Sequence, residues 1–134
     1  MPRRAAAALA SLVAAGGLLL GACGSSGAAN ALARQACVHV QRSISLYESS
    51  NSLPTASAIL ARRAQATSEL NRALPLAARA TSADGQWNGL MTTISEIARV
   101  SESHLIPALK LQCAAADTNQ PLLPSTPTTF PPAP

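Results

Sequence analysis

Apolar residues in the middle of the chain recur every three or four positions, the spacing of helices that bury one face. No stretch alternates apolar and polar residues as a half-buried strand does. The first predicted helix covers residues 31–49. A loop at residues 51–54 ends it, because Pro54 suits the first turn of a following helix. The apolar positions of this first helix are Ala33, Cys37, Val40, Ile44 and Tyr47.

The second predicted helix covers residues 55–80. Pro75 removes a helical hydrogen bond, so we expect it to kink or shorten this helix. Residues 81–84, Thr-Ser-Ala-Asp, resemble a capping box with Asp in place of Glu, and a third helix is expected to start there. The second helix turns these residues toward the core: Ile59, Ala66, Leu70, Leu74 and Ala77.

The third helix either stops near Arg99 or continues to Cys113. The hydroxyls of Ser101 and Ser103 can cap a new helix, and Pro107 is unfavourable inside a long one. We therefore predict an all-α fold, a small up-down four-helix bundle, with a three-helix bundle and a kinked last helix as the alternative. The apolar positions are Trp87, Leu90, Met91, Ile94, Ile97 and Ala98, followed by Leu105, Ala108, Leu109 and Gln112.

The N-terminal residues have the layout of a signal peptide. Arg3 and Arg4 precede an apolar run, residues 5–20, that is shorter than the roughly 20 residues of a permanent membrane span. Leu20-Gly21-Ala22-Cys23 at its end resembles the lipobox of bacterial lipoproteins. The resemblance implies that residues 1–22 are removed and that Cys23 is acylated, which anchors the protein on the extracytoplasmic face of the cell membrane. The alternatives are an ordinary cleaved signal and an uncleaved anchor.

Both ends of the mature chain are expected to lack a fixed fold. Residues 23–30 comprise the acylated cysteine and a short Gly- and Ser-rich tether, which favours flexibility. Residues 117–134 form a Pro- and Thr-rich tail with six prolines in its last fourteen positions, which predicts extended or disordered chain. The helical bundle is thus assigned to residues 31–116.

The two remaining cysteines are expected to pair. In an oxidising compartment we expect Cys37 and Cys113 to be joined in a disulfide, with two buried free thiols as the alternative. A disulfide needs Cα atoms about 5.5 Å apart. Cys37 lies thirteen residues before Ser50, about 20 Å along a helix. A turn near Ser101 returns Cys113 to a similar level, whereas a continuous third helix separates the sulfurs by about 20 Å. The bond therefore favours four helices, the last beside the first.

Composition and charge exclude several functions. From Cys23 onward eight Lys or Arg face six Asp or Glu, and this charge of +2 is too small and scattered for a nucleic-acid surface. No Gly-x-Ser-x-Gly elbow or catalytic carboxylate pair is found. His39 and His104 lack metal-ligand spacing, so no enzyme, metal site or cofactor is expected. The serines of the first helix are expected on a solvated face: Ser43, Ser45, Ser49 and Ser50.

Three residues remain as candidates for binding. Trp87 is expected in the core or as a helix cap, with a partner-binding anchor as the alternative. Arg62 and Arg63 are expected in solvent, with contact to acidic lipid headgroups as the alternative. In composition and layout the mature region resembles small Ala- and Arg-rich lipoproteins of GC-rich actinobacteria, a likeness that implies no particular activity.

The sequence therefore predicts a non-enzymatic, membrane-anchored envelope lipoprotein that acts through protein or cell-wall contacts. The alternative is a carrier of an apolar ligand, lipid or haem, in the helical bundle.

Overall fold

The computed structural model describes residues 25–118, which form four α-helices and two short 3₁₀ helices and contain no strand. α1 spans Ser25–Ser50 and α2 spans Ala56–Ala83. α3 spans Asn88–Ser95, between η1 (Gly85–Trp87) and η2 (Glu96–Ala98), and α4 spans Glu102–Thr118. The predicted all-α fold with four helices is confirmed.

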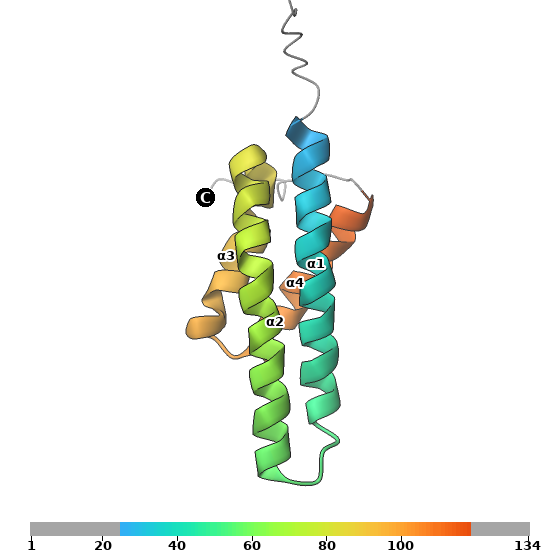
Figure 1. Cartoon of the computed structure of the whole chain (residues 1–134), viewed down its shortest axis with the longest axis vertical. Helices are drawn as coiled ribbons and strands as arrows, with labels where there is room; N and C mark the ends of the chain where they lie inside the picture. Colours follow the sequence, from blue (N-terminus) through green and yellow to red (C-terminus); the bar gives the residue numbers. More distant parts are fainter. Residues whose placement is uncertain (1–24, 119–134) are drawn as a thin grey trace, which may run out of the picture.

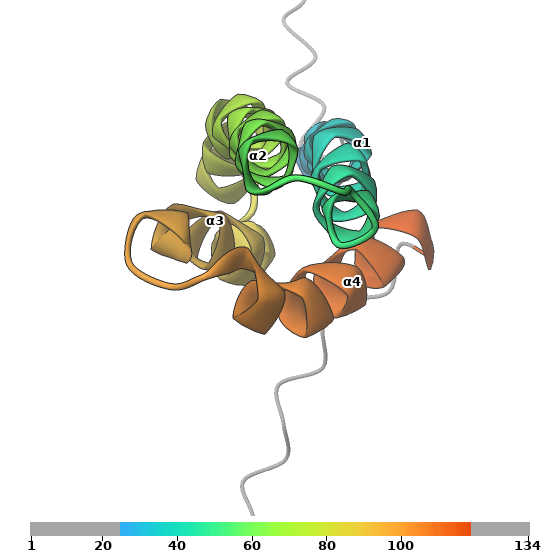
Figure 2. The same cartoon turned by 90° about the horizontal axis from the view of Figure 1, so that it is seen from below.

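A long antiparallel hairpin of α1 and α2 is the frame of the molecule, and α3 and α4 pack against one side of it (Figures 1 and 2). At 1.5 Å per residue, the 26 residues of α1 and the 28 of α2 extend about 39 and 42 Å, whereas the 17 of α4 extend about 26 Å. α3 and α4 lie near the open end of the hairpin, where α1 begins and α2 ends. The opposite end, which we call the tip, projects beyond them.

Small residues form the seam between α1 and α2. They recur in steps of four and three, the heptad spacing that keeps one seam facing the partner helix. Alanine lets two helices approach closely, so a chain with one Trp, one Tyr and one Phe still builds a continuous core. The fully buried seam residues are Ala29, Ala33, Ala36, Val40 and Ser43 of α1, and Ala66, Leu70, Ala73, Ala77 and Ala80 of α2.

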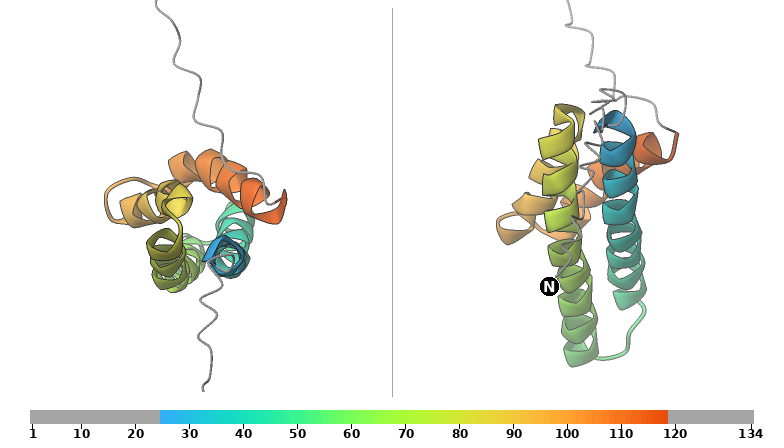
Figure 3. Two further views of the ribbon diagram at one scale, coloured as in Figure 1. Left: turned by 90° about the horizontal axis from the view of Figure 1, so that it is seen from above. Right: turned by 45° about the horizontal axis from the view of Figure 1, so that its top comes forward.

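α4 runs antiparallel to α1 and is inclined across it, and the four helices form a ring in which α4 neighbours α1 (Figure 3). Leu105, Leu109 and Cys113 turn inward from α4 in steps of four. Pro107 is the sixth residue of α4 and lies on its exposed side, where water can reach the Ser103 carbonyl that loses its helical hydrogen bond.

Two predicted boundaries at the ends of the bundle are wrong. α1 begins at Ser25 rather than Ala31, so residues 25–30 are helix and not a flexible tether. The reason is packing, because Ala29 is fully buried in the seam and extends the helix through the Gly- and Ser-rich segment. α4 likewise continues to Thr118, two residues into the predicted tail. Cys23, the signal segment and the rest of the tail lie outside the described residues.

The end of α2 also differs from its prediction. α2 continues through Pro75 to Ala83, so the proline does not shorten it. Pro75 is exposed, and water can therefore take the hydrogen bond that its ring removes. The capping box is wrong, since Thr81 lies inside α2 and its Oγ1 donates to the carbonyl of Ala77. Asp84 caps η1 instead, accepting a hydrogen bond from the backbone N–H of Gln86.

None of the described helices is both long enough and apolar enough to cross a bilayer.

Candidate functional site

The predicted disulfide joins the first helix to the last. Cys37 and Cys113 are bonded with Cα atoms 5.5 Å apart, and both are almost fully buried. Toward the open end, Arg34 Nε donates a hydrogen bond to the carbonyl of Ala116 at 3.0 Å. α4 therefore stays beside α1 from the disulfide to its C-terminus. The matching levels of the two cysteines confirm the turn before α4 that was predicted near Ser101.

Trp87 is buried in the core near the open end of the bundle. Its side chain is 2% exposed, and Nε1 donates a hydrogen bond to Asn30 Oδ1 at 3.2 Å. The side-chain amide of Gln86 donates to the same oxygen at 3.3 Å. Trp87 thus lies in the core, as expected, and is not exposed for a partner to bind.

A carboxyl group and a hydroxyl meet inside the bundle where α1, α2 and α4 adjoin. Ser43 is fully buried and Glu102 is 4% exposed. Ser43 Oγ lies 2.7 Å from the Ala66 carbonyl oxygen and within hydrogen-bond distance of Glu102 Oε1. A hydroxyl has one hydrogen, so when Ser43 donates to Ala66, Glu102 must be protonated to donate to Ser43. Burial raises the pKa of Glu102, and the hydrogen bond opposes that shift where Ser43 donates to the carboxylate instead.

The serines of α1 do not share one solvated face. Ser45 and Ser49 are exposed as expected, whereas Ser43 and Ser50 are fully buried. Ser50 lies at the tip, where its Oγ donates to the carbonyl of Tyr47 at 2.6 Å. The buried serines occupy seam positions, where a small side chain is needed and a backbone carbonyl accepts the hydroxyl hydrogen.

Arg62 and Arg63, adjacent in sequence, have different surroundings. Arg63 Nε donates to Ser50 Oγ at 3.2 Å, Nη2 donates to Asn51 Oδ1 at 3.1 Å, and the guanidinium lies 4.9 Å from the ring centre of Tyr47. Arg63 therefore ties the tip together. Arg62 points to the other side of the seam and forms no hydrogen bond or ion pair with the described residues.

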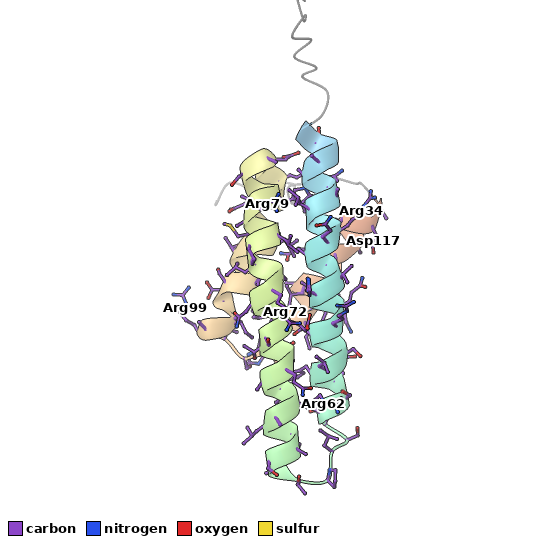
Figure 4. The ribbon with its side chains drawn as sticks, in the orientation of Figure 1. Arg34, Arg62, Arg72, Arg79, Arg99 and Asp117 are labelled. Atoms are coloured by element: carbon purple, nitrogen blue, oxygen red, sulfur yellow. A yellow bond between two sulfur atoms is a disulfide. The ribbon has the colours of Figure 1, made fainter. Side chains whose placement is uncertain are left out.

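The side of the hairpin that α3 and α4 leave uncovered carries most of its arginines. We call this side the open face. On each helix it comprises the residues beside the seam on the side that points away from α3 and α4. Figure 4 shows Arg62, Arg72 and Arg79 following one another along α2. The open face consists of Leu32, Gln35, His39, Arg42 and Leu46 of α1, and Arg62, Gln65, Glu69, Arg72, Leu76 and Arg79 of α2.

An ion network crosses the middle of the open face. His39 Nδ1 lies 2.7 Å from Glu69 Oε2, and Arg72 Nη1 lies 2.8 Å from Glu69 Oε1. The hydrogen bond with His39 lowers the pKa of Glu69, and the charges of Arg72 and Arg42 lower it further. Glu69 is thus ionised at neutral pH and holds the side chains of His39 and Arg72 in place. Arg42 and Arg79 have no hydrogen-bonded or ion-paired partner within residues 25–118.

Sequence reasoning missed the open face as a unit. Arg42, Arg72 and Arg79 were not singled out, although the signal was present. Residues 62, 65, 69, 72, 76 and 79 follow steps of three and four on the polar side of the second helix, parallel to its apolar stripe.

The described part of the chain contains no cluster of metal-ligating side chains. Between residues 25 and 118, no three His, Cys, Asp or Glu side chains are grouped so that they could hold an ion. His39 is hydrogen-bonded to Glu69, and His104 lies 3.3 Å from the Ser101 hydroxyl.

No protein-family model, curated protein or solved structure matches this chain significantly. The residues and their geometry therefore carry the functional proposal.

Proposed function

We propose that this protein is a membrane-anchored envelope lipoprotein that acts without catalysis, by presenting a rigid helical hairpin to a protein partner. The observation that carries the proposal is Leu20-Gly21-Ala22-Cys23, the lipobox-like stretch. Cys23 lies two residues before Ser25, where α1 begins. Acylation of Cys23 places the open end of the hairpin at the membrane, and two or three acyl chains hold a protein there stably where one is marginal.

The anchor is tested by Cys23→Ser in the native host. We expect the wild-type protein in the membrane fraction, with a mass above that of residues 23–134 by a diacylglyceryl group or more. C23S is expected to lose this added mass and to leave the membrane fraction or stay unprocessed. Ser26→Ala is the matched control and keeps both properties. A C23S protein that remains processed and membrane-bound contradicts the proposed anchor.

The tip supplies a surface for the partner. Leu60 is 67% exposed, yet it lies on the same stripe of α2 as Leu74, two heptads further on, which packs against the core. Leu60 differs because α3 does not extend to the tip (Figure 1). Leu53 and Ile59 are half-buried nearby along the chain. Leu60 is therefore an exposed apolar side chain at the tip that a protein partner could cover.

A photo-crosslinking residue at Ser57, one turn from Leu60, tests this surface in native membranes. We expect an adduct of discrete mass that is lost when Leu60 is also changed to Gln. The same crosslinker at Ala98, which is exposed on η2, is the positional control and should give no such adduct. An adduct that persists in L60Q, or that forms equally from position 98, rules out the tip as the contact.

A further inference from the structure

The positive charge of the described residues is concentrated on the open face. Arg42, Arg62, Arg72 and Arg79 outweigh Glu69 there, so the open face carries a net charge of +3. The other charged side chains of residues 25–118 add up to a formal charge of −1, or to zero when the buried Glu102 is protonated: Arg34, Arg63, Arg99 and Lys110 against Glu48, Asp84, Glu96, Glu102 and Asp117. The molecule is therefore electrically polarised across the hairpin.

The exposed cations elsewhere are largely paired. Arg99 Nη2 bonds Glu96 Oε1 at 2.5 Å, and Lys110 Nζ bonds Glu48 Oε1 at 2.9 Å. On the open face the single carboxylate, Glu69, is shared between His39 and Arg72. Most of the cationic charge available to an external anion is thus on one side.

We propose that the open face lies along an anionic lipid bilayer and that its arginines contact the phosphate headgroups. This inference deepens the proposed function and rests on it in one respect, because acylation of Cys23 is what holds α1 at the bilayer. The hairpin then lies flat, with α3 and α4 turned away from the lipid. Leu60 belongs to the stripe that faces the α3 side, so the partner surface at the tip stays accessible in this orientation.

The spacing of the arginines suits an extended surface. Arg62 and Arg79 are seventeen residues apart on α2, about 26 Å, and Arg72 lies between them. Arg42 is on α1, near enough to Glu69 to lower its pKa. The four charges therefore spread along and across the two antiparallel helices of the hairpin, where each can meet a different headgroup, and do not converge on one anion.

The composition of the open face favours lipid over an acidic protein. Strong protein contacts combine Arg with Trp or Tyr side chains in closely packed pockets, whereas the open face has arginines but no Trp, Tyr or Phe. Its leucines, Leu32, Leu46 and Leu76, are only half-exposed. Long arginine stems can cover such apolar surface while their guanidinium groups reach the phosphates.

The expected effect can be stated as a ratio. Near an anionic membrane each basic residue raises partitioning roughly fivefold, so a net charge of three gives about a hundredfold preference for anionic over neutral lipid. Arg62 and Arg79 are the best residues to change, since neither has a partner among residues 25–118 whose loss would disturb folding. Their joint replacement by Gln is expected to lower partitioning about 25-fold.

The experiment uses the whole mature chain, residues 23–134, carrying C23S so that no acyl chain contributes. Sedimentation with phosphatidylcholine vesicles, with and without one-third phosphatidylglycerol, measures partitioning at low and high salt. We expect binding only to the anionic vesicles, a decrease with salt, and the 25-fold loss in R62Q/R79Q. R99Q/K110Q is the matched control, because it removes the same charge from other faces and should change binding less than twofold. Circular dichroism verifies that each variant is folded.

Three results overturn the inference. Equal losses in R62Q/R79Q and R99Q/K110Q mean that only bulk charge matters. Equal binding to both vesicle types removes the electrostatic basis. An absence of vesicle binding, with an envelope-protein crosslink that depends on Arg62 and Arg79, identifies an acidic protein as the occupant instead. Because the chain in this assay is not acylated, failure of the Cys23 anchor in cells and failure of the open face on vesicles are separate outcomes.

Discussion

Removal of the Cys37–Cys113 disulfide is expected to lower the free energy of unfolding by about 5–6 kcal/mol. The bond spans a sequence separation of 76 residues, and the chain-entropy relation then gives about 15 cal/mol/K, or about 4.5 kcal/mol at 25 °C. Both positions are buried, so replacement by Ala also leaves small voids that add about 1 kcal/mol. Since small domains unfold with only about 5–15 kcal/mol, the double variant Cys37→Ala/Cys113→Ala should be marginally stable.

Guanidinium titration measures this cost, followed by circular dichroism at 222 nm and by the fluorescence of Trp87, the single tryptophan. The variants C37A, C113A and the double variant break the same crosslink, so each should lose a similar free energy and the two single losses should not add. The m-value should rise, because the unfolded chain without the crosslink exposes more surface. A loss below about 1 kcal/mol, or additive single losses, refutes a crosslink that acts through the unfolded chain.

Three further changes test the interior. Burial raises the pKa of Glu102, so the folded protein holds a proton that the unfolded chain releases above about pH 4.3. The stability of the wild type should therefore fall as the pH rises through the raised pKa. Glu102→Gln should match the wild type below pH 4 and exceed it at pH 7 in urea titrations. Asn30→Ala removes the acceptor of Trp87 Nε1 and should cost about 1–3 kcal/mol in thermal unfolding. Ala73→Leu overfills the seam and should cost at least about 1–3 kcal/mol, whereas the exposed Ala64→Leu should stay within about 0.5 kcal/mol.

The arrangement of four helices could be predicted because two independent constraints agreed. Periodicity left the segment from Arg99 to Cys113 open to two interpretations. The rise per residue favours four helices, because Cys37 and Cys113 reach the same height along the bundle only if the chain turns between Arg99 and Cys113. The structure has that turn and that bond. A covalent link between distant residues carries the long-range information that local patterns lack.

The errors lie where local chemistry is ambiguous. Gly27 and its serine neighbours favour a flexible tether as much as a helix start, and the burial of Ala29 decides in favour of helix. Thr81 and Asp84 both suit a helix N-cap, and only the length of α2 shows that Asp84 takes that role. The contact of Ser43 with Glu102 joins positions 59 residues apart, and it depends on the inclination of α4 across α1, which no sequence period encodes.

The first turn of α1 and the last turn of α4 lie together at the open end of the hairpin. α1 begins there, and the hydrogen bond from Arg34 to Ala116 places the last turn of α4 beside it, as Figure 4 shows for Arg34 and Asp117. The proposed anchor, Cys23, is two residues from Ser25 in the sequence, and the tip is the distant part of the fold, about 39 Å along α1.

An upright hairpin holds Arg62 beyond several Debye lengths of about 8 Å from the lipid, where its attraction to headgroups is screened. A flat hairpin brings all four arginines of the open face within one such length. Because the hairpin is joined to Cys23 through a single residue before Ser25, electrostatics has only to rotate it about that point. The flat orientation is therefore the one that uses the charge distribution of the fold, and removal of Arg62 and Arg79 should release the tip from the membrane while acylation keeps the open end in place.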